Sequence, residues 1–250
     1  SDPKVRWALS HAIDRQSIID KIVFGMGNTI ESHIFQKSKY LNTDLPKINY
    51  DPEKARKLLT EAGWKDTDGD GIIDKVINGK KTDFRFTFTN NTNPKRKKVL
   101  LIVIEQLKQL GIDASMQEYE WSVFLDKIKK HQYDACFAGW QLTAIPDDPY
   151  QIWHSSQSIG EGSNYFSYKN PESDKLLEAN RVEFDEAKRK EILYKWQKIV
   201  YDDQPVTFLW SEPVRYLNSN RYKNKRWYAY PDSPLLNQWW VPSARQLYKN

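Results

Sequence analysis

The stretch DFRFTFTNNTNPKRKKVLLIVIEQLKQLGIDASMQEY, residues 83–119, decides the fold class. Residues 84–88 place phenylalanine at every second position, which is the period of a strand with one buried face. An Asn-Pro start, an apolar periodic run and a closing glycine predict a helix over residues 93–111, and a second alternating segment follows it. A strand, a helix and a strand in this order predict parallel strands joined by a crossover helix, which is an α/β fold.

The segments before this unit carry equally clear cap and turn signals. Residues 51–63 begin with Asp and Pro, carry an apolar stripe and end at a glycine, so they predict a helix. The strand-like segments 72–77 and 83–89 flank the sequence NGKK, and Asn78 followed by Gly79 is a preferred pair for a two-residue β-turn. We therefore expect an antiparallel hairpin ahead of the crossover unit.

The rest of the chain continues in this style, with one long connection. The apolar segments 133–140 and 206–210 predict buried strands, and residues 170–181 and 184–203 have the period of helices. Residues 141–170 are predicted to be mostly loop, with a short helix that begins in PYQIW. A loop of this length inside a compact domain typically lines a binding site.

Composition places the chain among globular proteins. Of its 250 residues, 39% are hydrophobic, 28% charged and 14% aromatic, which excludes disorder and favours aromatic-lined surfaces. The net charge of +5 comes from 38 basic and 33 acidic residues spread along the chain. The basic run at 95–98 is expected to be a solvated helix face, so no nucleic-acid partner is predicted. The single cysteine, Cys136, lies in an apolar run that favours a buried side chain.

No motif in the sequence indicates an enzyme. The four histidines lack the HExxH spacing of a catalytic zinc site, and no GxSxG nucleophile turn is present. The glycine patterns of a P-loop and of a dinucleotide-binding turn are both incomplete. The motifs therefore predict no catalytic residue and no required cofactor.

The segment GWKDTDGDGIIDK, residues 63–75, concentrates acidic side chains directly after a predicted helix. Alternating acids, a glycine for a sharp turn and one further acid match the opening of a calcium-binding EF-hand loop. The closing glutamate is missing, because Ile77 stands at the twelfth position. A weak structural calcium ion is one prediction, and a polar turn is the other. The predicted calcium ligands are Asp66, Asp68, Asp70 and Asp74.

Several motifs occur together and in a fixed order. They are VRWALSHAIDRQSIIDKIVFGMG, YDPEKARKLLTEAGWKDTDGDGIIDK, IVIEQLKQLGI, GWQLTAIPDDPYQIW and YKNPESDKLLEANR. In this combination the chain, from Val5 to about Trp210, resembles the extracytoplasmic solute-binding proteins of family 5, the peptide-type receptors of ABC importers. The resemblance implies that the acidic DGDG loop belongs to the scaffold. We expect the AIDR motif to be structural, with Asp14 as a helix cap and Arg15 paired nearby.

The resemblance implies an α/β fold of the type II periplasmic-binding-protein kind, in which two lobes close on a ligand. Residues 1–204 resemble the second, C-terminal lobe, with a mixed sheet flanked by helices. Residues 205–250 resemble the segment that returns to the first lobe, most of which is absent from this chain. The chain is therefore expected to be a fragment that carries one side of the ligand cleft.

The resemblance also implies where the ligand binds. In the family, ligand contacts lie around a Gly-Trp strand end, here Gly139 and Trp140, and around the acidic loop that follows. In peptide receptors a carboxylate in that loop pairs with the α-ammonium group of the ligand. Because the run QLTAIP intervenes before the first acid, Asp147 is either a displaced anchor or the anchor is absent.

Three further residues are candidate ligand contacts. Trp153, Asn164 and Tyr165 lie in the segments that resemble the family's cleft loop and the stretch after it. Tryptophan dominates cores as well as pockets, so core packing is the alternative role for Trp153 and for Trp140. Turn closure is the alternative for Asn164 and Tyr165.

The function implied is that of an exported receptor in the periplasm or anchored at the cell surface. It would bind a peptide or a similar polar solute reversibly and deliver it to a membrane permease. The family also includes receptors for metal chelates, haem and oligosaccharides, so these ligands are alternatives. A calcium-stabilised extracellular interaction module is an alternative of a different class. Apolar surface left uncovered in the fragment would favour self-association.

Overall fold

The computed structural model describes residues 2–141, 148–160, 162–213, 217–226 and 236–247. In chain order, the elements of the first half are α1 (Pro3–Ala12), α2 (Arg15–Ile22), β1 (Asn28–Thr29), α3 (Pro52–Glu61), β2 (Asp74–Ile77), β3 (Lys80–Asp83), β4 (Arg85–Asn91), α4 (Pro94–Lys108) and β5 (Asp113–Tyr119). Those of the second half are α5 (Trp121–Lys129), β6 (Ala135–Cys136), α6 (Tyr150–Trp153), η1 (Ser155–Ser158), α7 (Pro171–Val182), α8 (Glu186–Asp203), β7 (Trp210–Ser211), η2 (Leu236–Gln238) and η3 (Ser243–Arg245).

Helices α1, α3, α4 and α7 begin with the same local arrangement. An Asp or Asn side chain accepts a backbone N–H of the first turn, and proline occupies the first helical position. In α3 the Asp51 carboxylate accepts the N–H of Lys54 at 2.9 Å. The starts predicted for α3 and α4 are therefore confirmed. None of the helices within the described residues is both long and apolar enough to cross a lipid bilayer.

The central sheet has the strand order β5-β4-β6, and both of its pairings are parallel. β4 and β5 run in register from Arg85 opposite Asp113 to Asn91 opposite Tyr119. Helix α4 connects these two strands and packs its apolar side against the phenylalanines of β4. The crossover unit predicted from residues 83–119 is confirmed.

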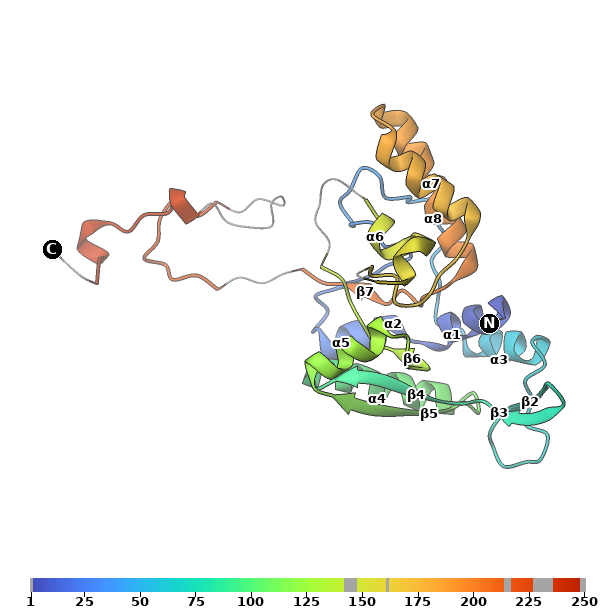
Figure 1. Ribbon diagram of the computed structural model, residues 1–250. Helices are drawn as coiled ribbons and strands as arrows, with labels where there is room; N and C mark the ends of the chain where they lie inside the picture. Colours follow the sequence, from blue (N-terminus) through green and yellow to red (C-terminus); the bar gives the residue numbers. More distant parts are fainter. Residues whose placement is uncertain (1, 142–147, 161, 214–216, 227–235, 248–250) are drawn as a thin grey trace.

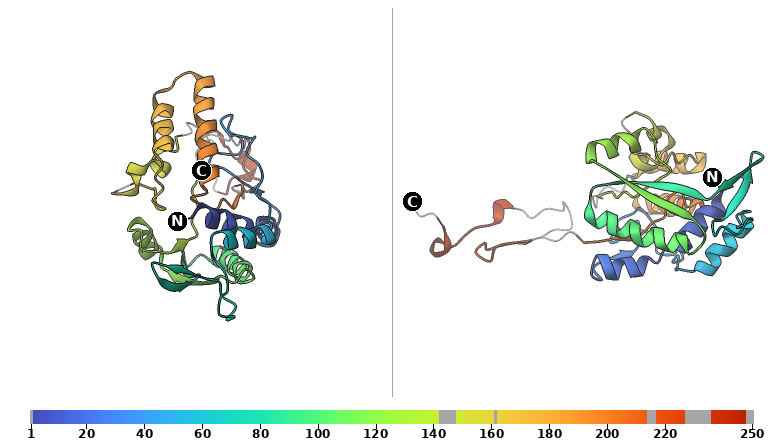
Figure 2. Two further views of the ribbon diagram at one scale, coloured as in Figure 1. Left: turned by 90° about the vertical axis from the view of Figure 1, so that its right-hand side faces the viewer. Right: turned by 90° about the horizontal axis from the view of Figure 1, so that it is seen from below.

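Two hydrophobic cores lie in the compact body of the molecule (Figure 1). The first joins α1, α3 and α4 to one face of the central sheet, and Phe84, Phe86 and Phe88 pack against it as their spacing predicts. The second core is built around Trp153 of α6 and Trp196 of α8, with α7 beside them. Figure 2 shows the α7–α8 pair rising on the side of the molecule opposite the central sheet.

The predicted hairpin forms, but its second strand is shorter than expected. β2 and β3 pair antiparallel, and the turn residues Asn78 and Gly79 have φ values of +52° and +77°. Both values suit the type I′ turn that the Asn-Gly pair favours. The single strand predicted over 83–89 is wrong, because the chain changes sheets at Phe84. There the ring packs on Trp64, with centroids 4.4 Å apart, and the following residues join the parallel sheet as β4.

Two other predicted strands are also shorter. Of residues 133–140 only Ala135 and Cys136 pair with β4, and both are half-buried rather than buried. Of residues 206–210 only the last is in a strand, where β7 pairs with β1. The carbonyl of Phe208 accepts the Arg15 guanidinium at 3.1 Å, so a side chain takes the place of a neighbouring strand there.

Residues 217–226 and 236–247 lie away from the compact body (Figure 1). They contact each other: Lys223 and Trp240 form an antiparallel bridge, and the rings of Tyr222 and Trp239 lie 5.8 Å apart. This segment, residues 217–226 and 236–247, exposes several large apolar side chains. They are Leu217, Leu236, Trp240 and Leu247.

Candidate functional site

Gly139 and Trp140 lie just beyond β6, at the edge where the parallel strands of the central sheet end. Gly139 is exposed, and a Cβ atom at this position would meet no atom within 4 Å. The half-buried ring of Trp140 contacts the rings of His33 and Phe166, with centroid distances of 5.7 Å and 6.0 Å. Ligands of α/β folds bind beyond the carboxyl ends of the strands, so this edge is the place where the fold favours a ligand.

His33 connects the two tryptophans of the predicted site. Its ring lies 5.7 Å from Trp140 and 5.6 Å from Trp153, in edge-on contacts. Burial lowers the pKa of His33 to about 4, so the imidazole is neutral at neutral pH. The sequence offered no signal for this residue, because a single histidine in a loop has no characteristic spacing.

Trp153 is fully buried in the second core. Its ring contacts Trp196 at 5.7 Å and Phe208 at 6.0 Å, and it touches Phe166 at 4.9 Å. These ring contacts are those of a core residue, while the buried indole Nε1 of Trp153 has no hydrogen-bond partner among the described residues. Through His33 and Phe166, however, Trp153 supports the ring of Trp140.

Asn164 and Tyr165 close a turn beside this cluster. Asn164 is fully buried, and its amide donates to the carbonyls of His154 at 3.1 Å and Tyr168 at 2.9 Å. Its side-chain oxygen accepts the N–H of Tyr168 at 3.0 Å. The carbonyl of Tyr165 accepts a hydrogen bond from Nδ1 of His131 at 2.7 Å, while its ring is half-buried. The contacts of Asn164 are those of a turn-closing residue.

The predicted ammonium anchor, Asp147, lies outside the described residues. Its neighbour Asp148 is exposed and forms an ion pair with Arg181 at 3.0 Å. The Asp148 carboxylate also accepts the N–H of Tyr150 at 3.2 Å, at the start of α6. Asp148 therefore stabilises the turn into α6.

Arg96 is a cation at the same sheet edge that sequence reasoning missed. Its guanidinium lies over the Phe137 ring, 5.9 Å from the centroid, and its Nη1 is buried without a hydrogen-bond partner in the described part of the chain. Burial lowers the pKa of Arg96. The prediction of a solvated face holds for Lys97 and Lys98 but is wrong for Arg96. Arg96 precedes the buried residue Val99 by three positions, which places both side chains on the same face of a helix. This spacing was the available signal in the sequence.

The acidic loop brings part of the predicted calcium site together. Ligand atoms of Asp66, Asp68 and Asp74 lie within 4.8 Å of one another, and Asp70 is not in this group. Asp66 accepts two backbone N–H groups of the loop, at 2.7 Å and 3.0 Å. Asp74 is buried and accepts the N–H and hydroxyl of a neighbouring threonine.

Lys81 supplies a cation to the same acidic loop. It pairs with Asp68 and lies 3.6 Å from Asp74. The hydrogen bond from Lys81 lowers the pKa of Asp68, and hydrogen bonds from Thr67 lower that of Asp74. The loop can therefore hold its shape as a polar turn, and calcium binding stays a prediction.

Comparison with known proteins places these features in a family. The model of "Bacterial extracellular solute-binding proteins, family 5 Middle" matches residues 1–163. The chain is 38% identical over 246 residues to the oligopeptide-binding protein AppA of Bacillus subtilis (strain 168), covering 96% of this chain and 44% of that protein.

Two solved structures show the same fold. AppA of Bacillus subtilis in complex with a nonapeptide matches with a TM-score of 0.82 and 35% identity, over 96% of this chain and 48% of that one. NikZ of Campylobacter jejuni in complex with Ni(L-His) matches with a TM-score of 0.76 and 25% identity, over 84% and 42%.

The chain spans less than half the length of these relatives. The predicted α/β architecture, of the type II periplasmic-binding-protein kind, is confirmed by the likeness to solved receptors of the family. Because the family model covers well over half of the residues, the chain belongs to family 5 of the bacterial extracellular solute-binding proteins.

Proposed function

We propose that this chain is one lobe of a solute receptor of an ABC importer, which binds a peptide reversibly and delivers it to a membrane permease. The receptor acts outside the cytoplasm, in the periplasm or at the cell surface, as the description of the family supports. The names of the relatives support binding rather than catalysis, and no residue is assigned a catalytic role.

The observation that carries the peptide assignment is the guanidinium of Arg96. Buried polar atoms in proteins are nearly always hydrogen-bonded, so a buried Nη1 that has no partner among the described residues calls for one. A carboxylate is the group that a guanidinium binds most favourably, through charge-assisted hydrogen bonds. The free carboxylate of a peptide would supply it at the edge that Phe137 and Trp140 line.

The second support is the shape of that edge. Exposed Gly139 lets a ligand backbone approach closely, and the ring of Trp140 offers an apolar surface beside it. An extended peptide needs open space for its backbone, which forms hydrogen bonds, and an apolar surface for its side chains, which occupy pockets. Trp140 and the segment after it are therefore proposed as ligand contacts, with Asp147 as the candidate partner of the α-ammonium group.

We further propose that residues 1–204 form the second lobe and that residues 205–250 rejoin a first lobe. Relatives that extend to more than twice the matched length support a missing lobe. The exposed apolar side chains of the C-terminal segment support the same arrangement, because such a patch needs a covering partner. Without that lobe, the same surface would drive self-association of the chain.

Oligosaccharides and metal chelates are the second class of ligand. The half-buried ring of Trp140 would suit a sugar if its face is open to the ligand, and the likeness to the Ni(L-His) receptor supports a chelate. A calcium-stabilised interaction module has less support, because the acids of the loop already have hydrogen-bond or ionic partners.

The test is titration calorimetry of the full-length, two-lobed receptor with short peptides that carry either a free or an amidated C-terminus. We expect free peptides to bind at least tenfold more tightly, since a hydrogen bond to a charged group contributes about 1.5–3 kcal/mol. Arg96→Met should remove this difference, whereas Lys98→Met, an exposed cation on the same helix, should preserve it.

Two outcomes would contradict the proposal in different ways. Equal affinity of the unsubstituted receptor for free and amidated peptides would contradict the proposal that Arg96 binds the peptide carboxylate. Binding of oligosaccharides or metal chelates, with none of any peptide, would leave the receptor fold and replace the ligand class.

A further inference from the structure

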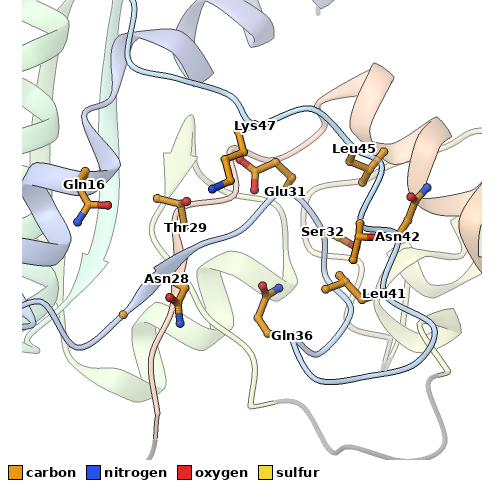
Figure 3. Close-up of a pocket in the computed structure, with 12 residues that line it drawn as sticks. Gln16, Asn28, Thr29, Glu31, Ser32, Gln36, Leu41, Asn42, Leu45 and Lys47 are labelled. Atoms are coloured by element: carbon orange, nitrogen blue, oxygen red, sulfur yellow. The ribbon is translucent and has the colours of Figure 1, made fainter.

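A polar pocket opens beside β1 and the segment that follows it (Figure 3). Its volume is about 420 Å³, within the ~300–1,000 Å³ that small-molecule sites occupy. The residues that line it are Gln16, Gly27, Asn28, Thr29, Glu31, Ser32, Gln36, Leu41, Asn42, Thr43, Leu45 and Lys47. Amide and hydroxyl side chains predominate among them.

Some of these polar groups already serve the fold. The hydroxyl of Ser32 donates to Gln197 at 2.8 Å, and the Asn42 amide donates to the carbonyl of Tyr194 at 3.3 Å. The Glu31 carboxylate accepts from Arg15 at 2.8 Å, so its charge is compensated. These groups form the structural wall of the polar pocket.

Other groups of the lining have no hydrogen-bond partner within the described ranges. The side chains of Asn28, Thr29 and Gln36 form no hydrogen bond to any described residue, and Figure 3 shows Asn28 and Gln36 on the same side of the pocket. Each carboxamide can both donate and accept a hydrogen bond. The unpaired polar groups of the pocket therefore suit a partner that also does both.

The polar pocket adjoins the candidate site at Trp140. Ser32 and Gln36 line the pocket, while His33 between them packs edge-on against the Trp140 ring at 5.7 Å. One short segment thus presents Ser32 and Gln36 to the pocket and His33 to the Trp140 cluster. A ligand seated at Trp140 would have the polar pocket beside it.

We propose that the polar pocket is a subsite of the receptor that binds an uncharged polar group of the ligand, such as the carboxamide or hydroxyl side chain of a peptide, through Asn28 and Gln36. The inference rests on the proposed function and adds the chemistry of one position of the ligand. The polar pocket does not favour an ion: Arg15 neutralises Glu31, and Lys47 is exposed to water, which screens its charge.

The experiment uses the full-length receptor and a set of alanine pentapeptides in which one position carries Gln, Ser, Glu or Leu. Affinities are measured by titration calorimetry at each position. We expect one position at which Gln and Ser bind about tenfold more tightly than Leu or Glu, because two neutral hydrogen bonds are gained. A linear oligosaccharide is titrated in parallel as the other source of neutral hydroxyl groups.

The variant that tests the subsite combines Asn28→Leu with Gln36→Met, which keeps side-chain size and removes both carboxamides. It should lose the tenfold preference while the all-alanine peptide binds as before. Gln132→Met, an exposed glutamine outside the pocket, is the matched control and should keep the preference.

The outcomes separate the subsite from the proposed function. A preference that persists in the double variant, or a preference for Glu, overturns the subsite but leaves a peptide receptor. Binding of the oligosaccharide alone, weakened tenfold in the double variant, overturns the peptide assignment and keeps the subsite with a hydroxyl ligand. Binding of neither probe overturns the subsite together with the proposed ligand classes.

Discussion

Replacing Arg15 by methionine tests how the segment that carries the polar pocket is held in place. Arg15 is 5% exposed, and its guanidinium donates to the carboxylate of Glu31 at 2.8 Å and to the carbonyl of Ile30 at 2.8 Å. It also donates to the carbonyls of Phe208 at 3.1 Å and of Ile48. The AIDR motif is therefore structural, and this single side chain ties α2 to three other parts of the chain, at residues 30–31, 48 and 208.

The expected magnitude follows from the burial of the pair. Methionine fills a similar volume but leaves Glu31, with 12% of its side chain exposed, without a counter-charge. Removing one partner of a buried ion pair destabilises a protein by about 3–5 kcal/mol. We therefore expect Arg15→Met to lower the free energy of unfolding by ~4 kcal/mol. The control is Arg85→Met, whose side chain is 50% exposed and pairs with surface acids, and it should cause a much smaller loss.

The assay is urea unfolding of the full-length receptor, followed by circular dichroism, with midpoints compared at unchanged slope. Arg15→Met combined with Glu31→Leu should recover part of the loss, because no lone buried charge remains. Similar midpoints for Arg15→Met and Arg85→Met would refute the reasoning that the buried pair holds this segment.

Three further predictions concern the tryptophans, His33 and the acidic loop. Trp153→Ala should lower the free energy of unfolding by about 3–5 kcal/mol because it empties the second core, whereas Trp140→Ala should mainly weaken ligand binding; urea midpoints and calorimetry distinguish the two. Burial lowers the pKa of His33 to about 4 in the folded protein. Between pH ~6.5 and a pH equal to this lowered pKa, the unfolded chain therefore binds one proton more than the folded protein, and the free energy of unfolding falls as the pH falls through this range. His33→Phe should flatten this part of the stability profile, and an unchanged profile would contradict the assignment. Calcium should raise the melting temperature by mass action, and Asp66→Asn with Asp68→Asn should abolish the rise; no rise in the unsubstituted protein would favour the polar turn.

Local signals in the sequence were sufficient for the helix starts, the hairpin turn and the parallel unit. A cap with its proline, or an Asn-Gly pair, acts over a few residues, so its effect does not depend on distant neighbours. The change of sheet at Phe84 was not predictable, because the alternation of β4 continues unbroken from the hairpin. Only the packing of Phe84 on Trp64 and the pairing of β4 with β5 place the break there.

Some features of the candidate site were likewise predictable from the sequence, and others were not. The sequence by itself determined the family, through the order of its motifs, and it indicated Gly139 and Trp140 at the end of a strand. Only the tertiary structure decided that His33 supports Trp140 and that a buried atom of Arg96 has no partner among the residues that the structure describes. The physical reason is that burial and pairing depend on elements that meet from distant parts of the chain. A residue on a helix, such as Arg96, is therefore exposed or buried depending on which other elements pack against that face of the helix.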